Sequence, residues 1–354
     1  METLEKLPNI ARLSERVVRI LGLNPGKFTL QGTNTYLIGK GSRKVLLDTG
    51  EGNPDYIPLL QTALDQDLKG ATISRVICSH WHHDHVGGIQ DVLRFLAARN
   101  IHLSQQVQQP PGDTLPGIYK FPDQEHDDSE TPFQRINDQE EIQVDEQTTL
   151  ITLHTPGHTA DHCSFYLKEE NTLFTADCVL GQGTAVFEDL SSYIKSLERQ
   201  LTIGSSSSSS SSFGTGQLQP SYKIYPGHGP VIEDGPTKIR EYIKHRLDRE
   251  KQILAVLIGG SSSSSSSSPS SNNNNINSNS NNAAGLPIIA GKTAMQIVTV
   301  IYAGYPSSLY PAAEHQVLLH LKKLEQDGKV KRGPAELISD AVWESVQGSA
   351  QASL

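Results

Sequence analysis

Short apolar runs separated by turn residues recur along the first part of the chain. Asn-Pro-Gly at 24–26 and Gly-Ser at 41–42 supply turns between the first three runs. Short runs of branched aliphatic residues joined by such turns are typical of an antiparallel or mixed β-sheet. The runs that predict strands are residues 17–21, 35–38, 44–50 and 74–78. Residues 54–68 lie between the last two strands and predict a helix.

Strand-like and helix-like patterns then alternate, which favours an α/β fold. The runs that predict strands are residues 150–153, 163–167, 172–175 and 224–225. Apolar residues at helical spacing predict a helix that begins near residue 89, and two more at 193–201 and 238–258. Residues 99–145 contain several prolines and no sustained pattern, so we expect a loop-rich excursion with short strands there.

The last part of the chain predicts a separate small domain. Residues 294–302 and 311–326 have helical periodicity, and the second segment gathers its Leu and Val residues on one face. A basic segment at 328–333 follows as a turn and a strand. Two helices followed by a short hairpin predict a winged-helix-like unit.

Two low-complexity segments interrupt the pattern. Residues 205–212 are serines, and residues 261–282 are almost all serine and asparagine. Neither segment has enough apolar side chains to form a core, so we expect disordered insertions. We therefore predict a large domain at 1–258, a disordered linker at 259–285 and the winged-helix-like domain at 286–354.

The composition narrows the possible partners and compartments. A formal net charge of −9 over 354 residues excludes a general attraction to nucleic acid, so any polyanion site has to be local. The three cysteines have no paired spacing, which argues against a disulfide framework and favours a reducing compartment. No apolar run approaches the roughly 20 residues of a membrane span. We expect a protein that has no membrane partner and is not secreted.

One loop concentrates residues that bind metal ions. The sequence His-Trp-His-His-Asp-His at 80–85 follows a predicted strand and precedes a predicted helix. Its ligand-type residues are His80, His82, Asp84 and His85. A lone histidine is more often an ordinary polar residue than a ligand. Imidazole and carboxylate crowded on one loop at a strand end instead indicate a site for zinc or a similar ion.

Three further ligand-type residues lie at predicted strand ends. His158 and His228 stand beside glycine, and Asp177 ends a strand. Seven ligands exceed the need of one zinc ion and suit two. We predict one ion held by His80, His82 and His158, a second held by Asp84, His85 and His228, and Asp177 as the bridge between them. Two ions about 4 Å apart can share a hydroxide as nucleophile, and we assign catalytic roles to Asp84 and Asp177.

This set of motifs resembles the metallo-β-lactamase superfamily, and Gly157-His158-Thr159 with Gly227-His228-Gly229 resembles its glyoxalase II-like branch. The resemblance extends over about residues 14–332, apart from the Ser- and Asn-rich insertions. It implies an αββα sandwich that forms the catalytic domain, two Zn²⁺ ions per chain and a C-terminal winged-helix-like domain. The members that the chain resembles most are endoribonucleases on single-stranded RNA that are associated with mitochondria. The resemblance therefore implies the mitochondrial matrix, with the cytoplasm as the alternative.

Three functions stay open for this site. The first is cleavage of single-stranded RNA, the second is glyoxalase II-like hydrolysis of a thioester, and the third is a non-catalytic nucleic-acid-binding scaffold. Basic residues at the end of the 311–326 helix favour RNA, and we name Lys323 and Lys329 as substrate contacts. Asn34 is a third candidate contact, although it can equally shape its Gly-Thr-Asn turn. Asp48 ends a strand and can orient a ligand histidine from behind.

Overall fold

The computed structural model describes residues 4–107, 115–127, 131–203, 221–259 and 291–346. The serine run at 205–212 and the Ser- and Asn-rich stretch at 261–282 lie outside these residues, as does the predicted linker after residue 259. The chain divides into two compact units, Met1–Ile243 and Lys244–Leu354.

A seven-stranded mixed sheet, ordered β1-β2-β3-β4-β5-β6-β7, forms one layer of the first unit. Its strands are β1 (Ile10–Arg12), β2 (Val17–Leu21), β3 (Asn34–Ile38), β4 (Arg43–Leu47), β5 (Thr72–Cys78), β6 (Gly117–Lys120) and β7 (Gln134–Arg135). The first four strands pair antiparallel with their neighbours, whereas β4 to β7 pair in parallel. Parallel neighbours need crossover connections, and the histidine loop lies in one of these.

A five-stranded sheet, ordered β12-β11-β10-β9-β8, forms the second layer. Its strands are β8 (Glu141–Asp145), β9 (Thr148–His154), β10 (Cys163–Leu167), β11 (Thr172–Ala176) and β12 (Lys223–Pro226). Strands β8 to β11 pair antiparallel, and β12 joins β11 in parallel. It follows that β9, β11 and β12 run in one direction and end at the same edge of the sheet.

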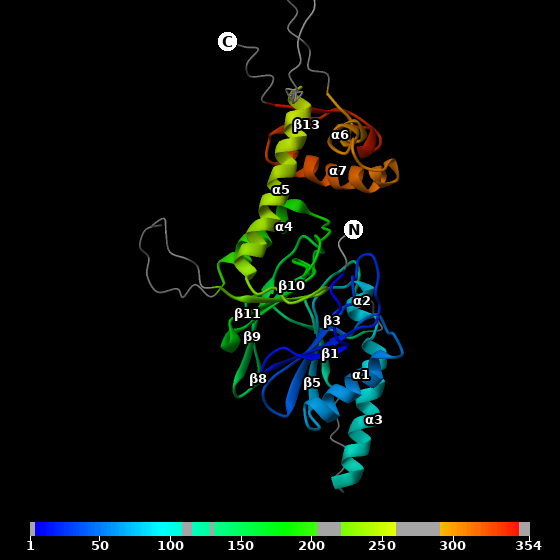
Figure 1. Ribbon diagram of the computed structural model, residues 1–354, viewed down its shortest axis with the longest axis vertical. Coiled ribbons are helices and arrows are strands. Elements are labelled where there is room, and N and C mark those ends of the chain that lie inside the picture. Colours follow the sequence, from blue (N-terminus) through cyan, green and yellow to red (C-terminus); the bar gives the residue numbers. More distant parts are fainter. Residues whose placement is uncertain (1–3, 108–114, 128–130, 204–220, 260–290, 347–354) are drawn as a thin grey trace, which may run out of the picture. The chain divides into compact units, whose positions relative to one another are not determined.

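Helices cover the outer faces of both sheets. They are α1 (Tyr56–Thr62), which continues as a π-helical turn at Ala63–Asp67, α2 (His83–Val86), α3 (Ile89–Val107), α4 (Leu190–Leu201) and the first part of α5 (Gly235–Ile258). In the first sheet, Val18 and Leu37 pack with the helices, while their neighbours Val17 and Ile38 pack in the core that the two sheets share. Figure 1 shows α1 and α3 on the side of the first sheet that faces away from the second sheet. This order of layers is the predicted αββα sandwich.

The second unit contains the remainder of α5, two further helices and a hairpin. Its elements after α5 are α6 (Ala294–Ile301), a 3-10 turn at Ser307–Leu309, α7 (Tyr310–Gln326), β13 (Val330–Arg332), a 3-10 turn at Ile338–Asp340 and β14 (Trp343–Ser345). A single apolar cluster joins them, with Trp343 fully buried between α6 and α7 residues such as Ile297 and Val317. Helices followed by an antiparallel hairpin match the predicted winged-helix-like unit.

Two details differ from the sequence prediction. Residues 99–145 contain the short strands β6, β7 and β8, as predicted, but they also contain the end of α3, which was not predicted there. The division between the units falls inside α5, after Ile243, because Ile253 and Leu257 of this helix pack in the core of the second unit. Among the described residues, no helix combines the length and the apolar character that a membrane crossing needs.

Candidate metal centre

Parallel strands bring the first part of the site together at one edge of the seven-stranded sheet. Asp48 follows β4 and His80 follows β5, and these two strands run parallel, so both residues lie at the same edge. The backbone nitrogen of Cys163, at the start of β10, donates to the carbonyl oxygen of Ser79 at 2.9 Å. This hydrogen bond joins the histidine loop to the second sheet.

The second sheet contributes the other predicted ligands from its own common edge. His158, Asp177 and His228 follow β9, β11 and β12, which end at the same edge of the sheet. The backbone nitrogen of Asn34 donates to the carbonyl oxygen of Gly227 at 2.7 Å and so joins this edge to the first sheet. A Cβ atom on Gly227 would lie 2.3 Å from Oδ1 of Asp177, so glycine at this position leaves room for the carboxylate.

The histidine loop turns sharply where β5 ends. His82 is extended, with φ −55° and ψ 139°, and it precedes the short helix α2. This helix buries His85 and leaves His83 exposed. A Cβ atom on Gly88 would lie 2.2 Å from the carbonyl oxygen of Thr49, so only glycine fits where the chain leaves α2.

Three imidazole nitrogens converge in the first donor group. Nε2 of His158 lies 3.0 Å from Nδ1 of His82 and 3.2 Å from Nε2 of His80. Nδ1 of His158 donates to the backbone oxygen of Val186 at 2.9 Å, so its Nε2 carries a lone pair that faces the other two rings. Asp177 completes the group, since one potential ligand atom from each of the four residues lies within 4.8 Å of the others.

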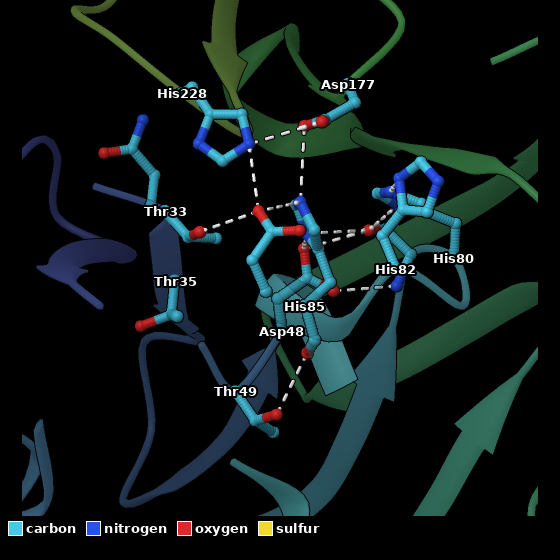
Figure 2. A network of polar contacts seen from close by, with 12 residues as sticks. Thr33, Thr35, Asp48, Thr49, His80, His82, His85, Asp177 and His228 are labelled. Atoms are coloured by element: carbon cyan, nitrogen blue, oxygen red, sulfur yellow. Dashed lines mark hydrogen bonds and ion pairs between the residues drawn. The ribbon is translucent and has the colours of Figure 1, made fainter. Parts of the chain in front are cut away.

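The second donor group combines Asp84, His85 and His228. Oδ2 of Asp84 lies 3.3 Å from Nε2 of His85 and 3.2 Å from Nε2 of His228. Asp177 lies between the two groups (Figure 2). Its Oδ1 is 3.3 Å from Nε2 of His85, and its Oδ2 is 3.2 Å from Nε2 of His228. The same Oδ2 is 3.6 Å from Nε2 of His158 in the first group.

Burial keeps the histidines of the first group neutral. It lowers the pKa of His82 to about 4, and the neighbouring His158 acts in the same direction. Burial likewise holds the pKa of His80 well below its usual value and lowers the pKa of His158. A neutral imidazole offers a lone pair, which is the form that binds a metal ion.

Carboxylates determine the pKa values of the histidines in the second group. Burial opposes a charge on His228, but Asp177 and Asp84 outweigh it and raise the pKa of His228 to about 9. The same balance between burial and neighbouring carboxylates raises the pKa of His85 well above its usual value. Burial also opposes the charge of Asp84, yet His85 and His228 hold the pKa of this carboxyl far below its usual range. The group therefore attracts a positive charge, which a proton or a metal cation can supply.

The chemistry of the donor set fits a divalent cation. Nε2 of His85 and Oδ1 of Asp177 are buried, and neither has a well-aligned hydrogen-bond partner among the described residues. The Nε2 lone pair of His158 points at other imidazoles rather than at a fixed donor. Zinc and similar ions accept nitrogen and carboxylate oxygen in one coordination shell, so they suit these atoms.

Asp48 holds His85 from behind, as its strand-end position predicted. Its Oδ2 accepts from Nδ1 of His85 at 2.8 Å, so Nε2 is the nitrogen of this ring that faces the donor group. The carboxylate also accepts from the backbone nitrogen of Ser79 at 2.7 Å and from its hydroxyl at 2.9 Å. Asp48 has a left-handed backbone with φ 61°, which is strained for a residue with a side chain and is typical of functional sites.

A buried charge cluster supports the first donor group, and sequence reasoning missed it. Nζ of Lys120 lies 2.7 Å from Asp161 and 2.6 Å from Asp127. The other oxygen of Asp161 accepts from the hydroxyl of Thr159, next to His158, at 2.7 Å. Lys120 lies in the segment expected to be irregular, and the strand that buries it is too short to give a periodic signal.

Aromatic rings also surround the first group. His162 is fully buried, with its ring centroid 5.3 Å from that of His80 and 5.7 Å from that of His158. Trp81 stacks on His126 with the ring centroids 3.9 Å apart and the planes within 1°. The position of His162 four residues after His158 is the one sequence signal that points to it.

Asn34 lies beside the donor groups, but its side chain is engaged by the protein. It is 1 % exposed, and its Nδ2 donates to the backbone oxygens of Pro226 and Gly229, both at 2.9 Å. Of the two interpretations of this residue, the geometry favours the structural one, because the amide fixes the loop around His228.

The two candidate lysines belong to the second unit and differ in access. Nζ of Lys323 lies 2.9 Å from Glu250 and 2.8 Å from Asp327, and only 12 % of its side chain is exposed. Lys329 pairs with Asp327 at 3.1 Å and is 43 % exposed. Lys323 is therefore part of a largely buried ion-pair cluster rather than a free cation, whereas Lys329 stays accessible.

Comparisons with known proteins agree with this architecture. Residues 28–228 match the Metallo-beta-lactamase superfamily, and residues 293–339 match the Beta-lactamase associated winged helix domain. The Beta-lactamase-like protein 2 homolog of Drosophila melanogaster is 37% identical over 327 residues, which cover 92% of this chain and 93% of that protein. The Atrochrysone carboxyl ACP thioesterase of Passalora fulva is 37% identical over 264 residues, which cover 73% of this chain and 66% of that protein.

A solved structure shows the same fold at low sequence identity. It is a beta-lactamase domain protein from Burkholderia ambifaria, 16% identical, with a TM-score of 0.63 and a match that covers 97% of this chain and 96% of that one.

Proposed function

The chain belongs to the metallo-beta-lactamase superfamily and carries the winged-helix domain associated with it, and from this premise we propose that it is a two-zinc hydrolase that cleaves single-stranded RNA. Membership and the clustered His and Asp residues make it a superfamily hydrolase with a candidate metal site. The number of ions, their identity and the RNA substrate are parts of the proposal.

The position of Asp177 is the observation that carries the two-ion proposal. Its two oxygens face different histidines of the second group, and one of them also faces His158 of the first group. A carboxylate shared by two adjacent donor groups is what a pair of ions about 4 Å apart requires. A single structural zinc ion needs only four ligands and leaves the other residues unexplained.

The residues of the chain prepare the site before a substrate arrives. When bound, a pair of divalent ions acidifies water and offsets the negative charge that develops on oxygen during hydrolysis. Asp48 fixes the tautomer of His85, and the backbone oxygen of Val186 does the same for His158. Burial opposes the charge of Asp177, but neighbouring histidines hold its pKa well below its usual value, so the carboxylate stays ionised between the groups.

Two features support RNA as the substrate class. The sequence resemblance that implied RNA extends over the winged-helix unit as well as the donor groups, since the similarity to the Drosophila protein spans more than nine-tenths of both chains. In that unit, Lys329 and Lys331 are 43 % and 63 % exposed and pair with surface carboxylates. Exposed ion pairs contribute only about 0–1 kcal/mol, so a phosphate can replace the carboxylate at little cost.

Hydrolysis of a thioester is the second candidate function. A relative that is 37% identical is named an ACP thioesterase, and the same activated water can attack an acyl carbon. The net charge of −9 and the engagement of Lys323 by two carboxylates also fit a substrate that is not a polyanion.

One experiment separates these functions. Full-length protein with a measured zinc content is incubated with a labelled single-stranded RNA and, separately, with an acyl thioester, each with and without a chelator. We expect RNA cleavage that the chelator and Asp177→Asn both abolish, and that the control Asp145→Asn retains. Thioester cleavage without RNA cleavage favours the second candidate. RNA binding by zinc-loaded protein that cleaves neither substrate favours the scaffold and overturns both enzymatic proposals.

We also propose the mitochondrial matrix as the compartment, on the sequence resemblance alone. Fractionation of cells that express the full chain with a C-terminal tag tests this proposal, and a purely cytoplasmic signal contradicts it.

A further inference from the structure

We propose that Thr33 is a positioning residue that sets the carboxylate of Asp84 for the second donor group. This inference rests on the two-ion site proposed above. Thr33 lies between β2 and β3, 51 positions before Asp84, and its hydroxyl lies 3.0 Å from Oδ2 of Asp84. Figure 2 shows Thr33 and its contact on the side of the network away from His80 and His82.

Asn24 fixes the direction of this hydrogen bond. The Oδ1 atom of Asn24 accepts from the backbone nitrogen of Thr33 at 2.8 Å, which settles the orientation of the amide. Nδ2 of Asn24 then donates to the hydroxyl of Thr33 at 3.0 Å. A hydroxyl has one proton, and an ionised carboxylate can only accept. The proton of Thr33 is therefore directed to Asp84.

The backbone around Thr33 is held on both sides. Its carbonyl oxygen accepts from the backbone nitrogen of Gly22 at 2.7 Å, and Thr33 forms an isolated antiparallel bridge with His228. Thr33 is 0% exposed, and Asn24 is 7% exposed. The hydroxyl thus sits on a rigid segment that is tied directly to a second member of the same donor group.

Asp84 depends on such an anchor more than the histidines of its group. It lies on a four-residue helix, and its side chain is 21% exposed, against 0% for His85 and 2% for His228. The oxygen that receives the hydrogen bond from Thr33 is the same Oδ2 that faces Nε2 of both histidines. The hydrogen bond therefore selects which of the two carboxylate oxygens of Asp84 faces the histidines of the second donor group. Removing an outer partner of a metal ligand typically costs ~10- to 100-fold in metal affinity or activity.

Thr35 provides a matched control in the same structure. It is also 0% exposed, but its hydroxyl contacts the backbone oxygen of Ile20 at 3.1 Å and the hydroxyl of Tyr56 at 2.8 Å. Neither partner belongs to a donor group. Thr35→Val therefore removes a buried hydroxyl from the neighbouring strand without touching Asp84.

The test is a zinc titration of metal-free, full-length protein against a chromophoric chelator, with wild type, Thr33→Val, Thr33→Ser and Thr35→Val. In Thr33→Val we expect the first equivalent to bind as in wild type and the second to bind ~10- to 100-fold more weakly. Thr33→Ser keeps the hydroxyl and restores the second equivalent, and Thr35→Val leaves both unchanged. Visible absorption of the cobalt-substituted proteins gives a second readout of the geometry at each group.

Four outcomes overturn the inference or separate it from the proposed function. Two equivalents with wild-type affinity in Thr33→Val, or equal weakening in Thr33→Ser, overturn it. If wild type itself binds fewer than two ions, the two-ion function fails first and this inference fails with it. If Thr33→Val does not fold, Asn24→Ala takes its place in the test, because it keeps the hydroxyl of Thr33 but removes the amide that directs the hydroxyl proton to Asp84. Unchanged binding of the second ion by Asn24→Ala overturns the inference.

Discussion

Replacing Asp48 by asparagine is expected to weaken the second donor group without disturbing the fold. Asparagine has nearly the same shape, and it tolerates the backbone φ of 61° better than alanine does. In the wild type, the carboxylate accepts three hydrogen bonds, from the nitrogen and hydroxyl of Ser79 and from Nδ1 of His85. An amide has one oxygen and one NH2 group, so at least one of these donors loses its acceptor.

The geometry places that loss on His85. The backbone N–H of Ser79 can only donate, so the amide oxygen stays opposite it and the NH2 group takes the place of Oδ2. Nδ1 of His85 can then accept only if the ring moves its proton to Nε2, the atom that faces Asp84 and Asp177. Once a metal ion occupies Nε2, the remaining proton has to stay on Nδ1, where it faces the NH2 group and has no acceptor. A buried donor left without a partner costs roughly 1–3 kcal/mol, which corresponds to a ~5- to 150-fold loss of affinity.

Zinc titration of metal-free Asp48→Asn against a competing chelator measures this loss for each equivalent. We expect the second ion to bind more weakly by that factor, the first to bind normally, and hydrolysis to recover at high zinc concentration. Asp145→Asn is the matched control, because Asp145 also accepts backbone N–H groups, from Lys40 at 2.6 Å and Gly41 at 2.9 Å, at the far edge of the second sheet. Wild-type affinity for both ions in Asp48→Asn, or equal weakening of both, refutes this reasoning.

Four further predictions follow from the same geometry. Asp177→Asn is expected to abolish hydrolysis with an unchanged circular dichroism spectrum, because its carboxylate lies between the groups at a strand end; turnover at the wild-type rate contradicts the assignment. Acidification is expected to release the second ion first. Binding there displaces a proton from His228, whose pKa is about 9, and another from His85, whose pKa also lies well above its usual value, so affinity falls by at least ~10-fold per pH unit below about 9. His82 in the first group stays neutral down to a pKa of about 4. Zinc content after dialysis at each pH checks this order of release, and simultaneous loss of the two ions refutes it. In the metal-free protein, the raised pKa of His228 contributes stability that is complete below the usual value of 6.5 and is lost as the pH rises through about 9. Melting temperatures of the metal-free protein across this pH range check the stability prediction. Lys329→Ala is expected to weaken RNA cleavage at low salt and to leave the zinc content unchanged. The slope of log affinity against log salt concentration should become shallower by ~0.7, while the surface control Lys168→Ala has no effect. If Lys329→Ala cleaves RNA like the wild type, the winged-helix unit does not bind the RNA.

The donor groups could be predicted from the sequence because each ligand stands where an apolar run stops. His158, Asp177 and His228 follow strands whose pattern is clear in isolation, and parallel pairing then brings their ends to one edge. The structure brings all seven predicted metal-site residues together in two adjacent groups. The role of Asp48 behind a ligand was predictable for the same reason, since it also ends a strand.

The residues that hold the ligands from behind could not be predicted in the same way. A hydroxyl such as that of Thr33 gives no pattern, and its partner Asp84 is chosen by how the β2–β3 segment folds against the histidine loop. Lys120 is buried in a four-residue strand, where periodicity is too short to detect. Lys323 pairs with Glu250 because α7 packs against α5 in the second unit. The basic cluster in the sequence gave no sign of this ion pair.

The two donor groups differ in the charge of the groups that surround their histidines and accept hydrogen bonds from them. This difference sets the order in which the two groups bind metal ions. The backbone oxygen that accepts from Nδ1 of His158 is neutral, and burial keeps the three imidazoles of the first group unprotonated. Behind His85 stands the carboxylate of Asp48, and Asp84 and Asp177 add their charges to the second group. More negative charge strengthens the attraction for a cation, but it also strengthens the attraction for the proton that competes with it. The second group therefore gains most affinity as the pH rises, so a protein purified at a mildly acidic pH is expected to retain the first ion and to have lost the second.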